Sequence, residues 1–129
     1  MRYMMLIYSR ESQDGRSPED AAQIYAGHAK VMQEATRKGV LLGAEPLSPT
    51  VTATTVRMQN GKTMVTDGPF AETKEQLAGY YIIDCANLDE AIEWASQIPT
   101  GCKGKEGCIE IRPMPGLPAR PDGRTARNG

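Results

Sequence analysis

The chain has 129 residues, a length that folds as one domain around a modest hydrophobic core. Its formal net charge of −1 offers no electrostatic basis for binding nucleic acid. Residues 1–8 form an apolar run too short for a signal peptide or a membrane span, so we expect a cytoplasmic protein that makes no membrane contact. Cys102 and Cys108 lie close enough in sequence to pair, but the cysteines form no Cys-x-x-Cys motif and a cytoplasmic location favours reduced thiols.

The first half of the chain predicts a strand, a long helix and a second strand. Arg2–Tyr8 is a strand with apolar residues on both faces. Ser17 followed by proline and two acids is a typical helix start, and a lysine followed by Gly39 is a typical end, so a helix is expected over residues 17–38. Its apolar stripe at helical spacing consists of Ala21, Ile24, Tyr25, His28, Val31, Met32 and Ala35. Val40–Ala44 is the second predicted strand.

The second half begins with a predicted hairpin and a buried strand. Thr52–Met58 and Lys62–Val65 are extended runs joined by Asn60-Gly61, a dipeptide that strongly indicates a tight hairpin turn. Leu77–Asp84 is rich in aromatic and β-branched residues and is apolar on both faces, which is typical of a central strand.

A second helix, a closing strand and a tail complete the predicted elements. The helix begins at the Asn87 cap, with Glu90 as its capping-box partner, and ends at Pro99. Its apolar stripe consists of Leu88, Ala91, Ile92, Ala95 and Ile98, with Trp94 at the margin. Cys108–Arg112 is the closing strand, and the prolines that follow predict a disordered tail over residues 115–129.

The order of these elements predicts a fold class. Without the hairpin, the order is β-α-β-β-α-β, which is the ferredoxin-like arrangement of an α+β protein. Right-handed crossovers then place both helices on one face of the sheet. The first strand and Leu77–Asp84 are apolar on both faces, so the second face needs a cover that one chain cannot supply. We therefore expect a homodimer that forms through this face of the sheet.

A compact turn lies between the hairpin and the central strand, at residues 67–70. Pro69 fixes its own φ angle, and Gly68 before it is disfavoured from the right-handed helical region. Asp67 can cap the turn as an Asx turn, or it can present a rigidly held carboxylate at the edge of a cleft. Phe70 is the only phenylalanine, and we expect it to anchor the turn in apolar surroundings.

The run TDGPFAETKEQLAGYYIID, residues 66–84, resembles the YCII-related, or DGPF-domain, proteins of bacteria. The resemblance extends over residues 1–114, and the DGPF block is long and specific. The other similar runs are MRYMMLIYS, GVLLGAEPL, TATTVRMQNGK, LDEAIEWASQIP and IEIRPM. The resemblance implies a dimeric α/β barrel built from the ferredoxin-like unit with its inserted hairpin, and residues 1–114 as the domain.

The resemblance also implies a site. YCII-type proteins are thought to use a histidine on the first helix together with an aspartate. His28 is similar to that histidine, and Asp67 is the best match for the aspartate because it belongs to the DGPF signature, with Asp84 and Asp89 as rivals. The residues alone leave two interpretations of His28 open, a buried hydrogen-bonded side chain or a general acid or base.

Three further residues are candidates for binding a substrate. Lys74 or Arg112 could anchor an anionic group, or Arg112 could pair across the dimer with Glu110, which shares its face of the last strand. Tyr80 and Tyr81 point to opposite faces of their strand, and both are first interpreted as core residues. One of them could instead line a cleft, and Tyr80 is our candidate. The cysteines and the single histidine lack zinc-site spacing, and no nucleotide-binding loop is present, so we expect neither a metal nor a cofactor.

Two functions follow as hypotheses. The leading one is a small dimeric enzyme, or enzyme-like small-molecule binder, in which a His28–Asp67 acid/base pair supports lyase or isomerase chemistry of the dehydrochlorinase kind. The alternative is a regulatory module without catalysis, because DGPF proteins are similar to those encoded beside extracytoplasmic-function sigma factors. A dimer whose cleft has lost its activity is a third interpretation.

Overall fold

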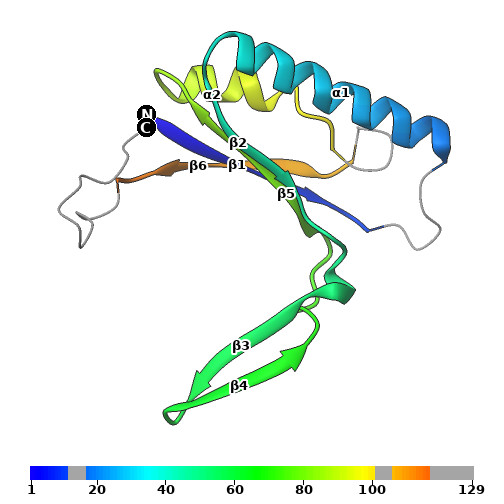
Figure 1. Cartoon of the computed structure of the whole chain (residues 1–129), viewed down its shortest axis with the longest axis vertical. Coiled ribbons are helices and arrows are strands. Elements are labelled where there is room, and N and C mark those ends of the chain that lie inside the picture. The colour runs from blue at the N-terminus through cyan, green and yellow to red at the C-terminus, as the bar shows by residue number, and fades with distance from the viewer. Residues whose placement is uncertain (12–16, 101–105, 117–129) are drawn as a thin grey trace.

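The computed structural model describes residues 1–11, 17–100 and 106–116, and it shows a mixed α+β fold (Figure 1). Two α-helices lie on one face of a four-stranded antiparallel sheet, and a two-stranded sheet projects from it. The elements are β1 (Arg2–Ser9), α1 (Pro18–Arg37), β2 (Leu41–Pro46), the short 3-10 helix η1 (Thr50–Thr52), β3 (Thr54–Gln59), β4 (Lys62–Asp67), β5 (Gln76–Asp84), α2 (Leu88–Ala95) and β6 (Cys108–Met114). The predicted helices and strands are thus all present, with small differences at their ends. Cys102 and residues 117–129 lie outside the described residues.

The larger sheet has the strand order β2-β5-β1-β6, and each pair of neighbours is antiparallel. At its centre, Met5 lies opposite Tyr81 of β5 and Ile111 of β6. The side chains of β1 alternate between buried and half-buried, because every second one faces the helices. The hydrophobic core therefore lies between the helices and one face of the sheet. Its fully buried members include Met5, Ala35, Ile83 and Ala91.

The start and end of α1 follow the predicted signals. The Ser17 hydroxyl accepts a hydrogen bond from the Asp20 N–H at 3.1 Å, and Pro18 occupies the first helical position. Gly39 has a φ angle of +73°, as a glycine after a helix end often has. The buried face of α1 is narrower than the predicted apolar stripe, because Tyr25, a member of that stripe, is 77% exposed.

The orientation of α2 differs from the prediction. The Asn87 side chain accepts from the Glu90 N–H at 3.0 Å, which confirms the cap. Trp94 is only 5% exposed, whereas Leu88 and Ile92 are about half exposed at 52% and 49%. The buried face consists of Ala91, Trp94, Ala95 and Ile98. The predicted stripe is confirmed for Ala91, Ala95 and Ile98. It was wrong for Leu88 and Ile92, because the large indole ring of Trp94 takes the core position instead.

Strands β3 and β4 form the separate two-stranded sheet, which extends away from the helices in Figure 1. Asn60 and Gly61 have φ angles of +51° and +77°, as a type I′ turn requires, so the predicted hairpin turn is confirmed. Val56 lies opposite Val65, and both side chains are 61% exposed. The hairpin therefore presents apolar side chains that its own chain leaves uncovered.

The turn after β4 is held by backbone groups. The Gly68 N–H donates to the Ala53 carbonyl at 2.7 Å, and the Thr55 hydroxyl donates to the Gly68 carbonyl at 2.8 Å. The Asp67 carboxylate accepts no hydrogen bond from a described residue. The expected Asx turn is therefore absent among the described residues. Phe70 is 74% exposed, so the expectation that it sits in apolar surroundings was wrong for the single chain.

Candidate functional site

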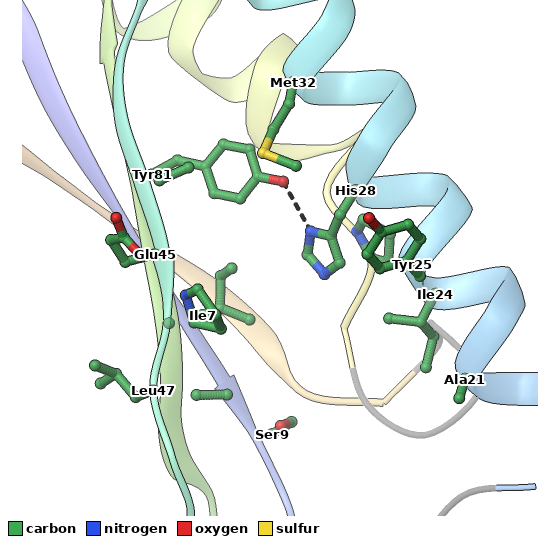
Figure 2. Close-up of a pocket in the computed structure, with 15 residues that line it drawn as sticks. Ile7, Ser9, Ala21, Ile24, Tyr25, His28, Met32, Glu45, Leu47 and Tyr81 are labelled. Carbon is green, nitrogen blue, oxygen red and sulfur yellow. Dashed lines mark hydrogen bonds between the residues drawn. The ribbon is translucent and has the colours of Figure 1, made fainter.

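A pocket of about 570 Å³ lies between α1 and the sheet (Figure 2). Most of the residues that line it are apolar. β1 contributes Ile7 and Ser9, α1 contributes Ile24 and His28, and β5 contributes Tyr81. A cavity of this size and character is typical of a small-molecule site.

The side chains of His28 on α1 and Tyr81 on β5 are in contact within the lining of the pocket. The His28 Nδ1 atom lies 2.8 Å from the Tyr81 hydroxyl oxygen, and the ring centroids are 5.9 Å apart. Tyr81 is 3% exposed, and this burial raises its pKa to about 12. The phenol is therefore neutral at physiological pH and able to donate or to accept a hydrogen bond.

Close backbone packing sets the walls of the pocket. A Cβ atom on Gly27, the residue before His28, would lie 2.6 Å from the Pro99 Cγ atom, so the glycine lets α1 approach the segment that follows α2. A Cβ atom on Gly79 would lie 2.7 Å from the Glu45 carbonyl oxygen. Both glycines therefore bring their elements closer than an alanine permits.

Ser9 is a residue of the pocket that the sequence analysis did not select. It is 5% exposed, and apart from the aromatic and cysteine side chains it is the one buried polar side chain in the part of the chain that the structure describes. It ends β1 and faces the pocket in the same alternation as Tyr3, Met5 and Ile7. That alternation is the sequence signal that could have found it.

The other sequence-predicted residues lie elsewhere in the chain. Tyr80 is on the sheet face opposite to Tyr81. Arg112 pairs with Glu110 of the same strand, with its Nε atom 3.2 Å from Oε1. Lys74 is an exposed loop residue, and Asp67 is the exposed last residue of β4. None of these candidates lines the pocket that contains His28.

The rival aspartates have other roles. The Asp84 carboxylate binds the N-terminal ammonium group at 3.2 Å, and Asp89 lies in the first turn of α2. The carboxylate-bearing residue among the described lining is Glu45. The pairing of His28 with Asp67 therefore stays a prediction, and within one chain the structure brings His28 to Tyr81 instead.

The segment with the DGPF signature lines a second, smaller cavity of about 360 Å³ beside η1. Glu11 links the end of β1 to η1. Its carboxylate accepts hydrogen bonds from the Thr50 N–H at 2.8 Å and from the Thr50 hydroxyl at 2.9 Å. The Glu11 N–H in turn donates to the Gln76 side chain at 2.8 Å. The signature therefore shapes the junction between the hairpin and the larger sheet.

The described residues contain neither a ready-made metal site nor a helix that could span a membrane. No group of three or more His, Cys, Asp or Glu side chains is placed there to hold a metal ion. None of the described helices combines the length and the apolar character that a membrane crossing needs. Cys85 is 7% exposed, and burial raises the pKa of its thiol.

Comparison with known proteins gives the family. Residues 1–115 match the YCII-related domain. The chain belongs to the YCII-related family. A relative from Rhizobium meliloti (strain 1021), "Uncharacterized protein R00369", is 40% identical over 115 residues. The matched region covers 88% of the present chain and 92% of the relative. The resemblance noted in the sequence is thereby confirmed, and the relative's name states no activity.

Proposed function

We propose that this YCII-related protein binds a small molecule in the pocket between α1 and the sheet, and that His28 exchanges a proton with it. Lyase or isomerase chemistry is the reaction class that such an exchange serves. The observation that carries the proposal is the 2.8 Å contact between the His28 Nδ1 atom and the Tyr81 hydroxyl inside a mostly apolar pocket.

The Tyr81 hydroxyl supports both proton states of His28. When Nδ1 has no proton, the phenol O–H donates to it, and the imidazole proton lies on Nε2. When Nδ1 carries a proton, the hydroxyl rotates and accepts from it. Histidine titrates near physiological pH, so a positioned imidazole serves as acid and as base in one reaction.

The predicted His28–Asp67 pair belongs to this proposal as a contact between two chains. Asp67 ends the exposed strand β4 and does not line the pocket of its own chain. A carboxylate supplied by a second chain would stabilise the protonated imidazole, which a neutral phenol does less well.

We expect His28→Gln to reduce proton exchange by about 100-fold or more, the usual contribution of a general acid or base. The measurement follows the loss of α-proton NMR signals from small cyclic ketones in deuterium oxide. Lys30→Gln is the matched control, because Lys30 is exposed on the same helix two residues further on. Equal exchange by the wild type and His28→Gln, or no exchange by the wild type, would contradict the catalytic proposal.

We further propose that the fold is a ferredoxin-like unit with an inserted hairpin, and that two copies pair into a dimeric α/β barrel. The strand order β2-β5-β1-β6 supports the first part. Both helices pack on one face of the larger sheet (Figure 1). The apolar residues that alternate onto the other face are half-buried, and they are Met4, Leu6, Tyr8, Tyr80 and Ile82. An isolated two-stranded hairpin is marginally stable, so the exposed hairpin also favours a partner chain.

The dimer is tested by placing a charge on this open face. We expect the wild type to be a dimer at micromolar concentration and Ile82→Lys to be a monomer, because the lysine would be buried without a partner. Ile92→Lys is the matched control, since Ile92 is 49% exposed on α2. Light scattering after size-exclusion chromatography gives the mass, and a monomeric wild type would overturn the dimer.

The regulatory role beside a sigma factor stays a prediction. A tail of the kind predicted over residues 115–129 would suit contact with such a partner, and most of it, residues 117–129, lies outside the described residues. The cytoplasmic location is likewise a prediction.

A further inference from the structure

We infer that the pocket selects a neutral, mostly apolar carbonyl compound, and that the Ser9 hydroxyl is the group that holds its carbonyl oxygen. This inference rests on the pocket of the proposed function and adds the class of its ligand. It goes beyond the His28–Tyr81 contact, because it assigns a binding role to Ser9 at the end of β1.

The first observation is the state of the Ser9 hydroxyl. Ser9 is 5% exposed and lines the pocket, and no described residue forms a hydrogen bond with its hydroxyl. Buried polar side chains in native proteins nearly always have a hydrogen-bond partner. A hydroxyl that faces a cavity and has no partner among the described residues is therefore a donor suited to an oxygen atom of a ligand.

The second observation is the placement of Ser9 relative to His28. Ser9 ends β1 and His28 lies on α1, so the two side chains come from opposite walls, and Figure 2 shows Ile7 and Ile24 beside the space between them. An apolar ligand body would contact the two isoleucines. The Ser9 hydroxyl would donate a hydrogen bond to the carbonyl oxygen at one end of the ligand. The carbon atoms next to the carbonyl group would then point toward His28.

The third observation is the charge of the lining. Among the described residues that line the pocket there is no lysine or arginine, and Glu45 is the acidic one. While the His28 imidazole is neutral, a carboxylate or phosphate ligand would lose its hydration without gaining a cation from the described lining residues, and it would meet a like charge at Glu45. The sequence-predicted anchors Lys74 and Arg112 do not line this pocket, so the lining favours a neutral ligand.

The test compares two probes with the same apolar body, cyclohexyl methyl ketone and cyclohexanecarboxylate. We expect the wild type to bind the ketone at least about tenfold more tightly than the carboxylate, since an unpaired buried charge is costly. Titration of backbone amide NMR signals gives both dissociation constants. Equal or tighter binding of the carboxylate would overturn the neutral class, and so would a lack of ketone binding at millimolar concentration.

The role of Ser9 is tested with Ser9→Ala. We expect ketone binding to weaken about three- to tenfold, which is the contribution of one hydrogen bond, and the infrared carbonyl stretch of the bound ketone to move to higher frequency. Ser96→Ala, on the exposed C-terminal cap of α2, is the matched control and should change neither quantity. Unchanged affinity and an unchanged carbonyl stretch in Ser9→Ala would overturn the role.

Two results separate this inference from the proposed function. The melting temperature of Ser9→Ala should not fall, because no described residue loses a hydrogen bond, whereas a structural role for Ser9 would lower it. If the ketone binds through Ser9 while His28→Gln leaves proton exchange unchanged, the ligand class stands and the catalytic proposal fails.

Discussion

Replacing Gly79 with alanine is expected to destabilise the protein by about 1–3 kcal/mol and to distort the pocket. The new Cβ atom would lie 2.7 Å from the Glu45 carbonyl oxygen and 3.2 Å from the Pro46 Cα atom. Both neighbours are backbone atoms of β2, so a side-chain rotation cannot relieve the contact. All three residues line the pocket, and a shift of β2 therefore changes its wall.

Gly43→Ala is the matched control for this substitution, because Gly43 lies on the facing strand. Its Cβ atom would meet the Ile82 side chain at 3.6 Å, an ordinary van der Waals contact. The change in the free energy of unfolding is expected to stay within about 1 kcal/mol, since alanine is also less flexible in the unfolded chain. Urea unfolding measures both variants, and equal losses would contradict the close approach of β2 and β5 at Gly79.

Trp94→Ala is expected to cost about 3–5 kcal/mol of stability, the usual loss when a large aromatic side chain is removed from a core. Trp94 is 5% exposed and belongs to the core cluster between the helices and the sheet. The Lys38 ammonium group also lies 5.5 Å from the centre of its ring, a cation–π contact that the substitution removes.

Ile92→Ala on the same helix provides the comparison. Ile92 is 49% exposed, so its truncation is expected to cost at most about 1 kcal/mol, because little apolar area leaves the core. The apolar stripe predicted from the sequence places Ile92 inside and Trp94 at the margin, and it would give the opposite order. Thermal or urea unfolding of the two variants decides between these orientations of α2.

Local signals in the sequence were sufficient for the elements. The caps at Ser17 and Asn87 and the hairpin turn at Asn60-Gly61 were predicted correctly, because each depends on backbone geometry within a few residues. The DGPF run also indicated the family that the comparison confirms. The candidate His28 follows from the same resemblance, and the structure places it in a pocket.

The partners of His28 could not be read from the sequence in the same way. Strand alternation shows that Tyr80 and Tyr81 face opposite sides, but not which side the helices cover. The structure puts Tyr81 under α1, where its hydroxyl reaches Nδ1 of His28. Ser9 was passed over although it continues the alternation of buried side chains along β1, because the alternation alone does not say that a pocket lies beside the end of the strand.

The sequence by itself therefore determined the order of the helices and strands, their caps and turns, and the family. Only the tertiary structure decided that Trp94 is inside, that Tyr81 rather than Tyr80 meets His28, and that Asp67 lies outside the pocket of its own chain. The physical reason is the range of the interactions. Capping and turn geometry act between neighbouring residues, whereas the buried face of each element is set by packing against segments far along the chain.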